Sequence, residues 1–432
     1  MSKLKILRIN TIPNFAKEYL ELNSLLNQDY ERLIKIIMSQ NFAHPGSWTK
    51  IFNSLDVKSY DIITNYDFIQ KKWLNEHHPY LEYDYIKTIY KQIEFYKPNI
   101  LFIYAGAFND FLPIELRKEL KKKFPFVKII TGLWGDHLIG GNYKSSFNDL
   151  DFIFTNCNLL AKKINAEGIK AIHLGNAFDP FVLEDCDEFL SKDLEKVFDV
   201  FFSGESGYNK FDHIERYHFL KFLMHNTDLT IFAEEYDKPK NVYLFFKDKI
   251  RVSTTKSISL LPTTIISKFM NSSTNFRVNR ILKESILYKK DKDFLVDHFK
   301  DELPLKDLFP GKVNKLTHSI REYYSNIKKS KIGINIHRND VTDVGNIRSF
   351  EVTGLNSLLL TDKGDEMRDY FKINDEYISY KNEKDCLDKI NYFLKNEKEL
   401  NQIALNGQKK CLSKHTIKNR CELIKEVLEK NL

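Results

Sequence analysis

Short apolar runs alternate with amphipathic segments along the first 180 residues. The runs are rich in Ile, Val and Phe. Between them, apolar residues recur at helical spacing, as in 83–96, 113–123 and 158–167. Such alternation predicts βαβ units around a buried parallel sheet. The expected strands are Leu4–Ile9, Asp61–Thr64, Ile100–Tyr104, Val127–Leu133, Asp151–Thr155 and Ala171–Leu174.

A second region with the same alternation begins near residue 199. Its rhythm breaks over about 237–305, where Ser/Thr clusters and many Lys and Asp residues predict an insertion of unassigned role. Further strands are expected at 199–204, 229–234, 331–336, 357–361 and 377–380, followed by helices. The pattern therefore predicts an α/β protein with two parallel-sheet domains, 1–190 and 191–432.

Composition narrows the class of protein. The chain has 432 residues, 42% of them hydrophobic, which suffices for two full cores. A net charge of +7 is mild and disfavours a nucleic-acid partner. The basic run of 117–128 reads as a solvated helix face.

Cellular location is constrained by three features. The five cysteines form no CxxC pair, which suits a reducing compartment and disfavours zinc. MSKLKILRIN enters a strand pattern without a signal-peptide pattern, and no apolar run approaches ~20 residues. We expect a cytoplasmic protein, with peripheral membrane contact left open.

The stretch KIGINIHRNDVTDVGNIRSFEVTGLNSLLLTD, residues 331–362, crowds polar residues between two apolar runs. Its first strand ends near His337, and a helix begins near Asn346. Ligands of open α/β sheets bind where strands end, and a helix start with Arg348 suits a diphosphate. Glu351, one turn deeper, suits a ribose diol. An intrahelical Arg348–Glu351 ion pair capped by Asp343 explains the same letters, and the residues alone do not separate the two interpretations.

Several segments resemble one known family. KIGINIH, GNIRSFE and LLLTD resemble the C-terminal module of the CgeB-type (spore-maturation-protein-like) glycosyltransferases, and so do FDVFFSG, NAFDP and HTIKNR elsewhere. The resemblance implies the GT-B fold, in which two Rossmann-like parallel-sheet domains face a central cleft and the last helix can return to the first domain. It also implies transfer of a sugar from a nucleotide sugar to a hydroxyl acceptor.

The resemblance also implies donor-side residues. Glu351 matches the glutamate that holds the donor ribose, and Asp343 falls at the first acidic position of an E-x7-E spacing, as Asp instead of Glu. Leu355-Asn356 departs from the usual Cys-Gly turn. The full expected donor set is Ser203, Gly204, Glu205, His337, Asn339, Asp343, Asn346, Arg348 and Glu351.

Candidate catalytic residues lie in the first half. His44 precedes Pro45-Gly46 and a helix start, where an imidazole could act as a general base. A plain turn with a Ser47 cap explains that loop equally. Asp136 and His137 follow a strand within GLWGDHLIGG, where they suit a base and its orienter or a turn.

Absent motifs exclude other chemistry. The chain lacks G-x-G-x-x-G after its first strand, a Walker A motif and a G-x-S-x-G elbow. DLD at 149–151 lies at the start of a strand, the wrong end for a metal–diphosphate site. We therefore expect metal-independent transfer without a further cofactor, to a glycan, a lipid-linked saccharide or a protein. The alternatives are a GT-B-shaped sugar-nucleotide or carbohydrate binding protein without activity and a sugar-nucleotide epimerase.

Overall fold

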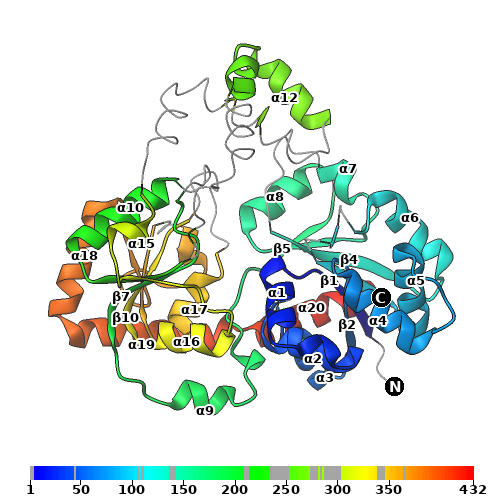
Figure 1. The fold of residues 1–432 in the computed structure, drawn as a ribbon, viewed down its shortest axis with the longest axis horizontal. Helices are drawn as coiled ribbons and strands as arrows, with labels where there is room; N and C mark the ends of the chain where they lie inside the picture. Colours follow the sequence, from blue (N-terminus) through cyan, green and yellow to red (C-terminus); the bar gives the residue numbers. More distant parts are fainter. Residues whose placement is uncertain are drawn as a thin grey trace.

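Two lobes lie side by side in the computed structural model of the chain (Figure 1). Each lobe is built around one parallel sheet with helices on both faces. The structure describes residues 4–42, 45–104, 107–108, 111–135, 143–208, 214–233, 235, 253–272, 281–282, 285–286, 303–337, 346–362 and 366–432.

The first domain contains a six-stranded sheet of order β2-β1-β3-β4-β5-β6, in which all neighbours pair in parallel. Its strands are β1 (Lys5–Asn10), β2 (Lys58–Ile63), β3 (Ile100–Tyr104), β4 (Ile129–Trp134), β5 (Ile153–Thr155) and β6 (Ala171–His173). Its helices are α1 (Asn14–Leu22), α2 (Tyr30–Ser39), α3 (Trp48–Ser54), α4 (Asp67–His77), α5 (Tyr85–Tyr96), α6 (Ile114–Lys123), α7 (Tyr143–Phe147) and α8 (Asn158–Ala166).

The second domain repeats this plan with the sheet order β12-β11-β10-β7-β8-β9, again all parallel. Its strands are β7 (Phe198–Ser203), β8 (Leu229–Phe232), β9 (Val313–Asn314), β10 (Ser330–Asn335), β11 (Leu358–Thr361) and β12 (Ile378–Ser379). Its helices are α10 (Ile214–Asn226), α15 (Leu305–Leu308), α16 (Ile320–Lys328), α17 (Arg348–Gly354), α18 (Glu383–Lys395) and α19 (Glu397–Lys414). Helix α12 (Thr263–Ser272) belongs to the insertion, and α9 (Cys186–Ser191) lies between the domains.

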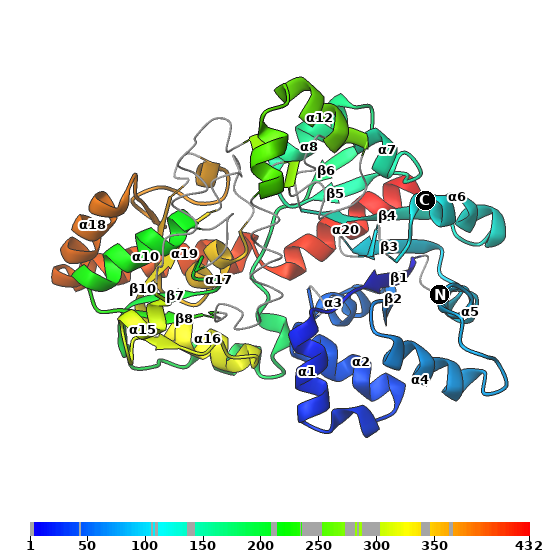
Figure 2. The same ribbon diagram turned by 45° about the horizontal axis from the view of Figure 1, so that its top comes forward.

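The last helix, α20 (Ile417–Asn431), belongs by packing to the first domain. Its buried residues Ile417, Cys421, Ile424 and Leu428 share one core cluster with Trp48 and other residues of α3, β1 and β3. Figure 2 shows α20 crossing beneath the first sheet. The two domains are therefore joined by two crossings of the chain.

The two crossings are hydrogen-bonded to each other. Phe178 in the first crossing donates its N–H to the carbonyl of His415 at 2.8 Å, and its own carbonyl accepts the N–H of Ile417 at 2.8 Å. Arg420 adds bonds to the carbonyls of Gly175 and Asn176. This short ladder fixes where one domain meets the other.

The sequence pattern predicted this architecture with few errors. The α/β class with two Rossmann-like parallel sheets is confirmed, and the eleven expected strands appear with bounds shifted by a few residues. Strand β9 was not predicted, because two half-buried residues between lysines give no alternation to read. The solvated-face reading of 117–128 is wrong at Arg117, which is buried against Asp149 at 2.7 Å.

Within the residues that the structure describes, no helix is both long enough and apolar enough to cross a bilayer.

Candidate functional site

A cavity of about 250 Å³ lies between the two domains, at the carboxyl end of β7. We call it the Glu351 cavity. The first domain contributes residues from α1 and from the end of α2, and the second contributes the ends of β7 and β9 and the faces of α16 and α17. Its lining is Phe15, Gln40, Asn41, Phe42, Ser203, Gly204, Leu316, Thr317, His318, Ser319, Ile320, Tyr323, Arg348 and Glu351.

Glu351 is a buried carboxylate in this cavity, 4% exposed. Its Oε2 accepts a hydrogen bond from the Tyr323 hydroxyl at 2.6 Å, and within the described residues Oε1 has no hydrogen-bond partner. Burial raises the pKa of Glu351, while the Tyr323 hydrogen bond and the charge of Arg348 act in the opposite direction. One oxygen is thus fixed by the protein, and the other is available to a ligand.

Arg348 lies beside Glu351, at the first turn of α17. Its guanidinium stacks on the Phe202 ring, 5.0 Å from the centroid. Gly204 makes this position possible, because a Cβ on residue 204 would lie 2.5 Å from Nη2 of Arg348. The Nε of Arg348 is buried and has no hydrogen-bond partner in the described part of the chain. A buried cation with an unused donor suits an anionic ligand.

Arg216, in the first turn of α10, is a second cation at the same sheet edge that our sequence analysis missed. Its guanidinium donates to the carbonyls of Glu205 and Ile336, at 3.2 and 3.0 Å. Desolvation and the charge of Arg348 lower the pKa of Arg216 to about 10. Its Nε also lacks a partner among the described residues. An Arg in the helix after the β7 glycine was the available signal.

Asn346 holds the start of α17 in place. Its Nδ2 donates to Asn335 Oδ1 at 2.7 Å, and its Oδ1 accepts the backbone N–H of Arg348 at 2.8 Å. Asn335 in turn binds Ser349 and Thr361 from its position in β10. The amide of Asn346 is therefore engaged by the protein, and it orients the helix that carries Arg348 and Glu351.

His337 lies at the end of β10, buried beside Asp362. Its Nδ1 is 2.5 Å from Asp362 Oδ1, and its backbone N–H donates to both carboxylate oxygens. The Nε2 atom is buried without a partner among the described residues. Asp362, which follows β11, was not among the expected site residues, because the two residues meet only through strand pairing.

The remaining expected residues divide into two groups. Ser203 and Gly204 line the Glu351 cavity, whereas Glu205 is exposed and contributes its backbone carbonyl to Arg216. The other expected residues, His44, Asp136, His137, Asn339 and Asp343, lie outside the described residues, so their roles stay predictions.

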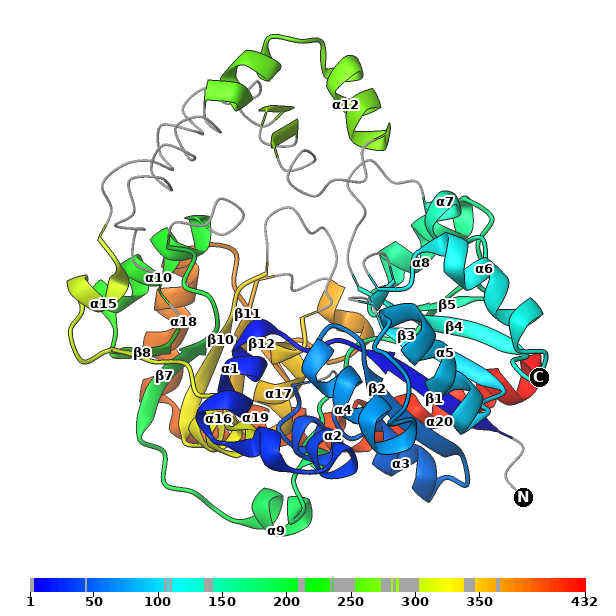
Figure 3. The same ribbon diagram turned by 45° about the vertical axis from the view of Figure 1, so that its right-hand side comes forward.

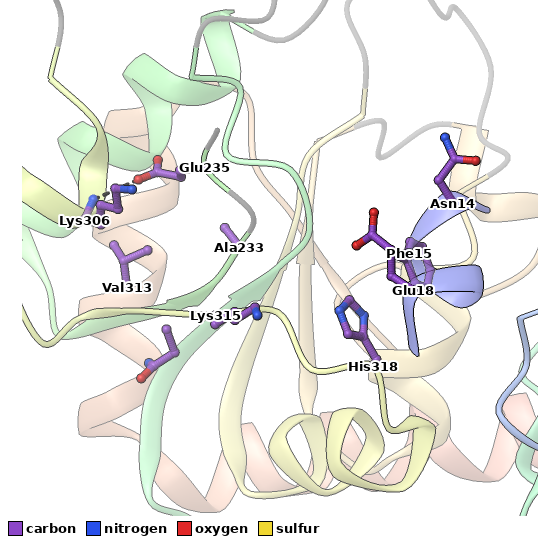
Figure 4. A pocket seen from close by; sticks show the side chains of 10 residues that line it. Asn14, Phe15, Glu18, Ala233, Glu235, Lys306, Val313, Lys315 and His318 are labelled. Carbon is purple, nitrogen blue, oxygen red and sulfur yellow. Dashed lines mark hydrogen bonds between the residues drawn. The ribbon is translucent and has the colours of Figure 1, made fainter. Parts of the chain in front are cut away.

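A second cavity of about 750 Å³ adjoins the first, and we call it the Lys315 cavity. His318 and Phe15 line both cavities and stack across the domains, with ring centroids 4.9 Å apart and planes at 11°. Figure 4 shows this pair facing Lys315 and Glu18, with Glu235 and Lys306 on the opposite wall. The stacked rings therefore divide the space between the domains in two.

The described residues offer no metal-binding group. No cluster of three His, Cys, Asp or Glu side chains occurs among them. The DLD letters at 149–151 are engaged otherwise, because Asp149 pairs with Arg117 and Asp151 pairs with Lys121.

Comparisons with known proteins agree with this geometry. Residues 307–426, which include Tyr323, Arg348 and Glu351, match a family described as "Glycosyl transferase-like". A structure of Anabaena Alr3699/HepE with UDP-glucose is similar over 99% of this chain and 100% of that chain, at 10% identity and a TM-score of 0.51. The chain has the GT-B fold.

A glycosyltransferase from Rickettsia africae shows the same GT-B arrangement, with a TM-score of 0.51, 10% identity and coverage of 100% of this chain and 99% of that one. No curated protein matches the chain by sequence. The narrower likeness to CgeB-type proteins is not tested by these matches and stays a prediction.

Proposed function

We propose that this protein is a glycosyltransferase that moves a sugar from a nucleoside diphosphate sugar to a hydroxyl acceptor without a metal ion. The observation that carries the proposal is the pairing of Glu351, with one oxygen unoccupied, and Arg348, with an unused donor, in one interdomain cavity. The match of residues 307–426 to a glycosyltransferase-like family supports it.

The donor nucleotide is placed by the chemistry of the lining. Glu351 Oε1 accepts hydrogen bonds from a ribose hydroxyl. Arg348 and Arg216 lie at the carboxyl edge of the second sheet and bind the diphosphate. The segment 316–320, which lines the same cavity, faces the base. Ser203 and Gly204 allow the phosphates to approach the backbone.

Transfer then needs charge stabilisation at the departing diphosphate. The bond between the sugar's anomeric carbon and the phosphate oxygen breaks, and its electron pair leaves with the diphosphate. The acceptor oxygen bonds to the same carbon and releases its proton. Two fixed guanidinium groups balance the growing negative charge, which is the task that a metal ion has in other enzymes. His44, Asp136 and His137 stay the candidates for accepting the proton.

Replacement of Glu351 by Gln tests the donor site directly. The similar HepE structure holds UDP-glucose, so UDP is the first nucleotide to measure by calorimetry. A lost charged hydrogen bond weakens binding by about 10- to 100-fold. The 2′-deoxy analogue of UDP should bind the wild type more weakly than UDP does, and it should bind Glu351→Gln as UDP does.

The control is Glu383→Gln, which changes an exposed glutamate of the same domain. Other nucleoside diphosphates follow if UDP does not bind. Unchanged nucleotide affinity in Glu351→Gln would contradict the assignment of the ribose site. Release of nucleoside diphosphate from a nucleotide sugar, with acceptor and excess EDTA present, separates a transferase from a binding protein, and loss of release in EDTA would refute metal independence.

A further inference from the structure

The insertion leaves and rejoins the second domain at one place. The carboxylate of Glu235, after β8, accepts the backbone N–H groups of Leu305 and Lys306 at 3.2 and 2.9 Å. The hydroxyl of Tyr217 donates to the carbonyl of Leu303 at 2.7 Å. Because both ends are tied to the same core, changes on the outer side of the insertion need not disturb the donor site.

The described part of the insertion, residues 253–272, has an inner and an outer side. Residues 253–259 are helical and lead through Leu260-Leu261-Pro262 into α12. The inner side packs Ile258 and Ile266 with Leu282 and Ile286. α12 stands at the outside of the molecule, away from both sheets (Figure 3).

The outer side carries an exposed apolar row. Leu260, Leu261, Ile265 and Phe269 are 83%, 41%, 41% and 58% exposed. Residues 261, 265 and 269 are four apart, so they follow one another along one face of the helix. Exposed apolar residues scattered singly are common, but a contiguous row marks a contact surface.

Basic charge is concentrated in the same part of the chain. Residues 238–290 contain 12 Lys and Arg and 2 Asp and Glu, a net charge of +10. The rest of the chain, with 54 basic and 57 acidic residues, carries −3. Within 253–272, Lys256 and Lys268 are exposed and no acidic residue occurs. The apolar row therefore lies in a strongly cationic setting.

We propose that the outer side of the insertion docks on an anionic lipid membrane, with the row Leu260, Leu261, Ile265 and Phe269 entering the boundary between headgroups and acyl chains. A helix with an apolar face and basic surroundings suits such an interface. The row is mainly aliphatic, which favours acyl chains over nucleic-acid bases, since bases stack on aromatic rings. Docking there would bring the interdomain cleft to a surface that holds lipid-linked acceptors.

Vesicle flotation of the full-length protein tests this surface. The probes are phosphatidylcholine vesicles and vesicles in which about a third of the lipid is phosphatidylglycerol. The wild type should float with the anionic vesicles, less so at high salt, and stay in solution with the neutral ones. A variant with Leu260→Gln, Leu261→Gln, Ile265→Gln and Phe269→Gln should partition at least about tenfold more weakly.

The matched control is Tyr80→Gln with Leu81→Gln, two residues of the first domain that are 97% and 47% exposed. It should float like the wild type. Thermal melting checks that each variant is folded. The proposal is overturned if the wild type does not float with anionic vesicles or if the four-residue variant floats unchanged. Binding of single-stranded RNA without flotation would overturn it in favour of a nucleic-acid partner.

Discussion

Tyr323 and Glu351 are 28 residues apart in the chain, yet one hydrogen bond between them decides how the carboxylate presents itself. The bond fixes Oε2 and leaves Oε1 facing the cavity. It also opposes the rise in pKa that burial imposes on Glu351. Tyr323 is therefore a positioning residue, which acts on a ligand through the carboxylate that it holds.

Replacement of Tyr323 by Phe should weaken nucleotide binding by roughly tenfold, because one hydrogen bond to a charged group is lost. The pKa of Glu351 should rise further, so the acid side of the affinity–pH profile should move to higher pH. Calorimetry at several pH values measures both effects. Tyr324→Phe serves as the control, since the hydroxyl of Tyr324 donates to the carbonyl of Asp179 instead. An unshifted profile in Tyr323→Phe would show that the hydrogen bond has no part in binding.

Sequence reasoning found the site residues that announce themselves locally. Arg348 and Glu351 lie one turn apart after a strand, and Gly204 ends another strand, so each has a local signal. Tyr323, Arg216 and Asp362 have none, because each meets its partner only once the sheet has formed. The expected assignment of Asn346 to the diphosphate stays a prediction, although its side chain already binds Asn335 and the helix start.

At the scale of elements, apolar alternation predicted strands and helices because buried parallel strands read as short continuous runs. It failed where an element is held by its neighbours alone. Strand β9 has two residues and pairs only with β8, yet the segment that follows it lines both cavities. The turn after β7 is the second such case, because Gly204 takes a φ of 135°.

Replacement of Gly204 by Ala should displace Arg348, since the new Cβ would lie 2.5 Å from Nη2. It should also cost about 1–3 kcal/mol of stability, because residues with a side chain rarely adopt that φ. Gly311→Ala is the matched control, with a φ of 81° and nothing within 4 Å of the added Cβ. Both variants should melt earlier, but only Gly204→Ala should lose nucleotide affinity. Equal affinities would show that Arg348 does not contact the nucleotide.

At the scale of the whole molecule, Asp179 joins the domains. It lies in the first crossing between them, and its carboxylate accepts the hydroxyl and the backbone N–H of Ser47 at the start of α3. Its carbonyl accepts the hydroxyl of Tyr324 from α16. Burial raises the pKa of Asp179 to about 6, although the hydrogen bonds from Ser47 lower it.

This raised pKa predicts a pH-dependent stability. The folded protein holds the Asp179 proton more tightly than the unfolded chain, whose value is near 3.8. The contribution of Asp179 to stability should therefore fall as pH rises from about 4 to about 6, by roughly 3 kcal/mol, and stay level above. The difference in unfolding free energy between wild type and Asp179→Asn, measured from pH 4 to 8, isolates this group. A difference independent of pH would contradict the buried, proton-holding state.

The return of α20 to the first domain sets the order in which the molecule can be completed during synthesis. The core around β1 and α3 includes Ile417, Cys421, Ile424 and Leu428, which are made about 400 residues after β1. At ribosomal rates of about 5–20 residues per second, that core waits roughly 20–80 s for its last helix. The second sheet has all its strands by residue 379, so the domain that is begun first is finished last.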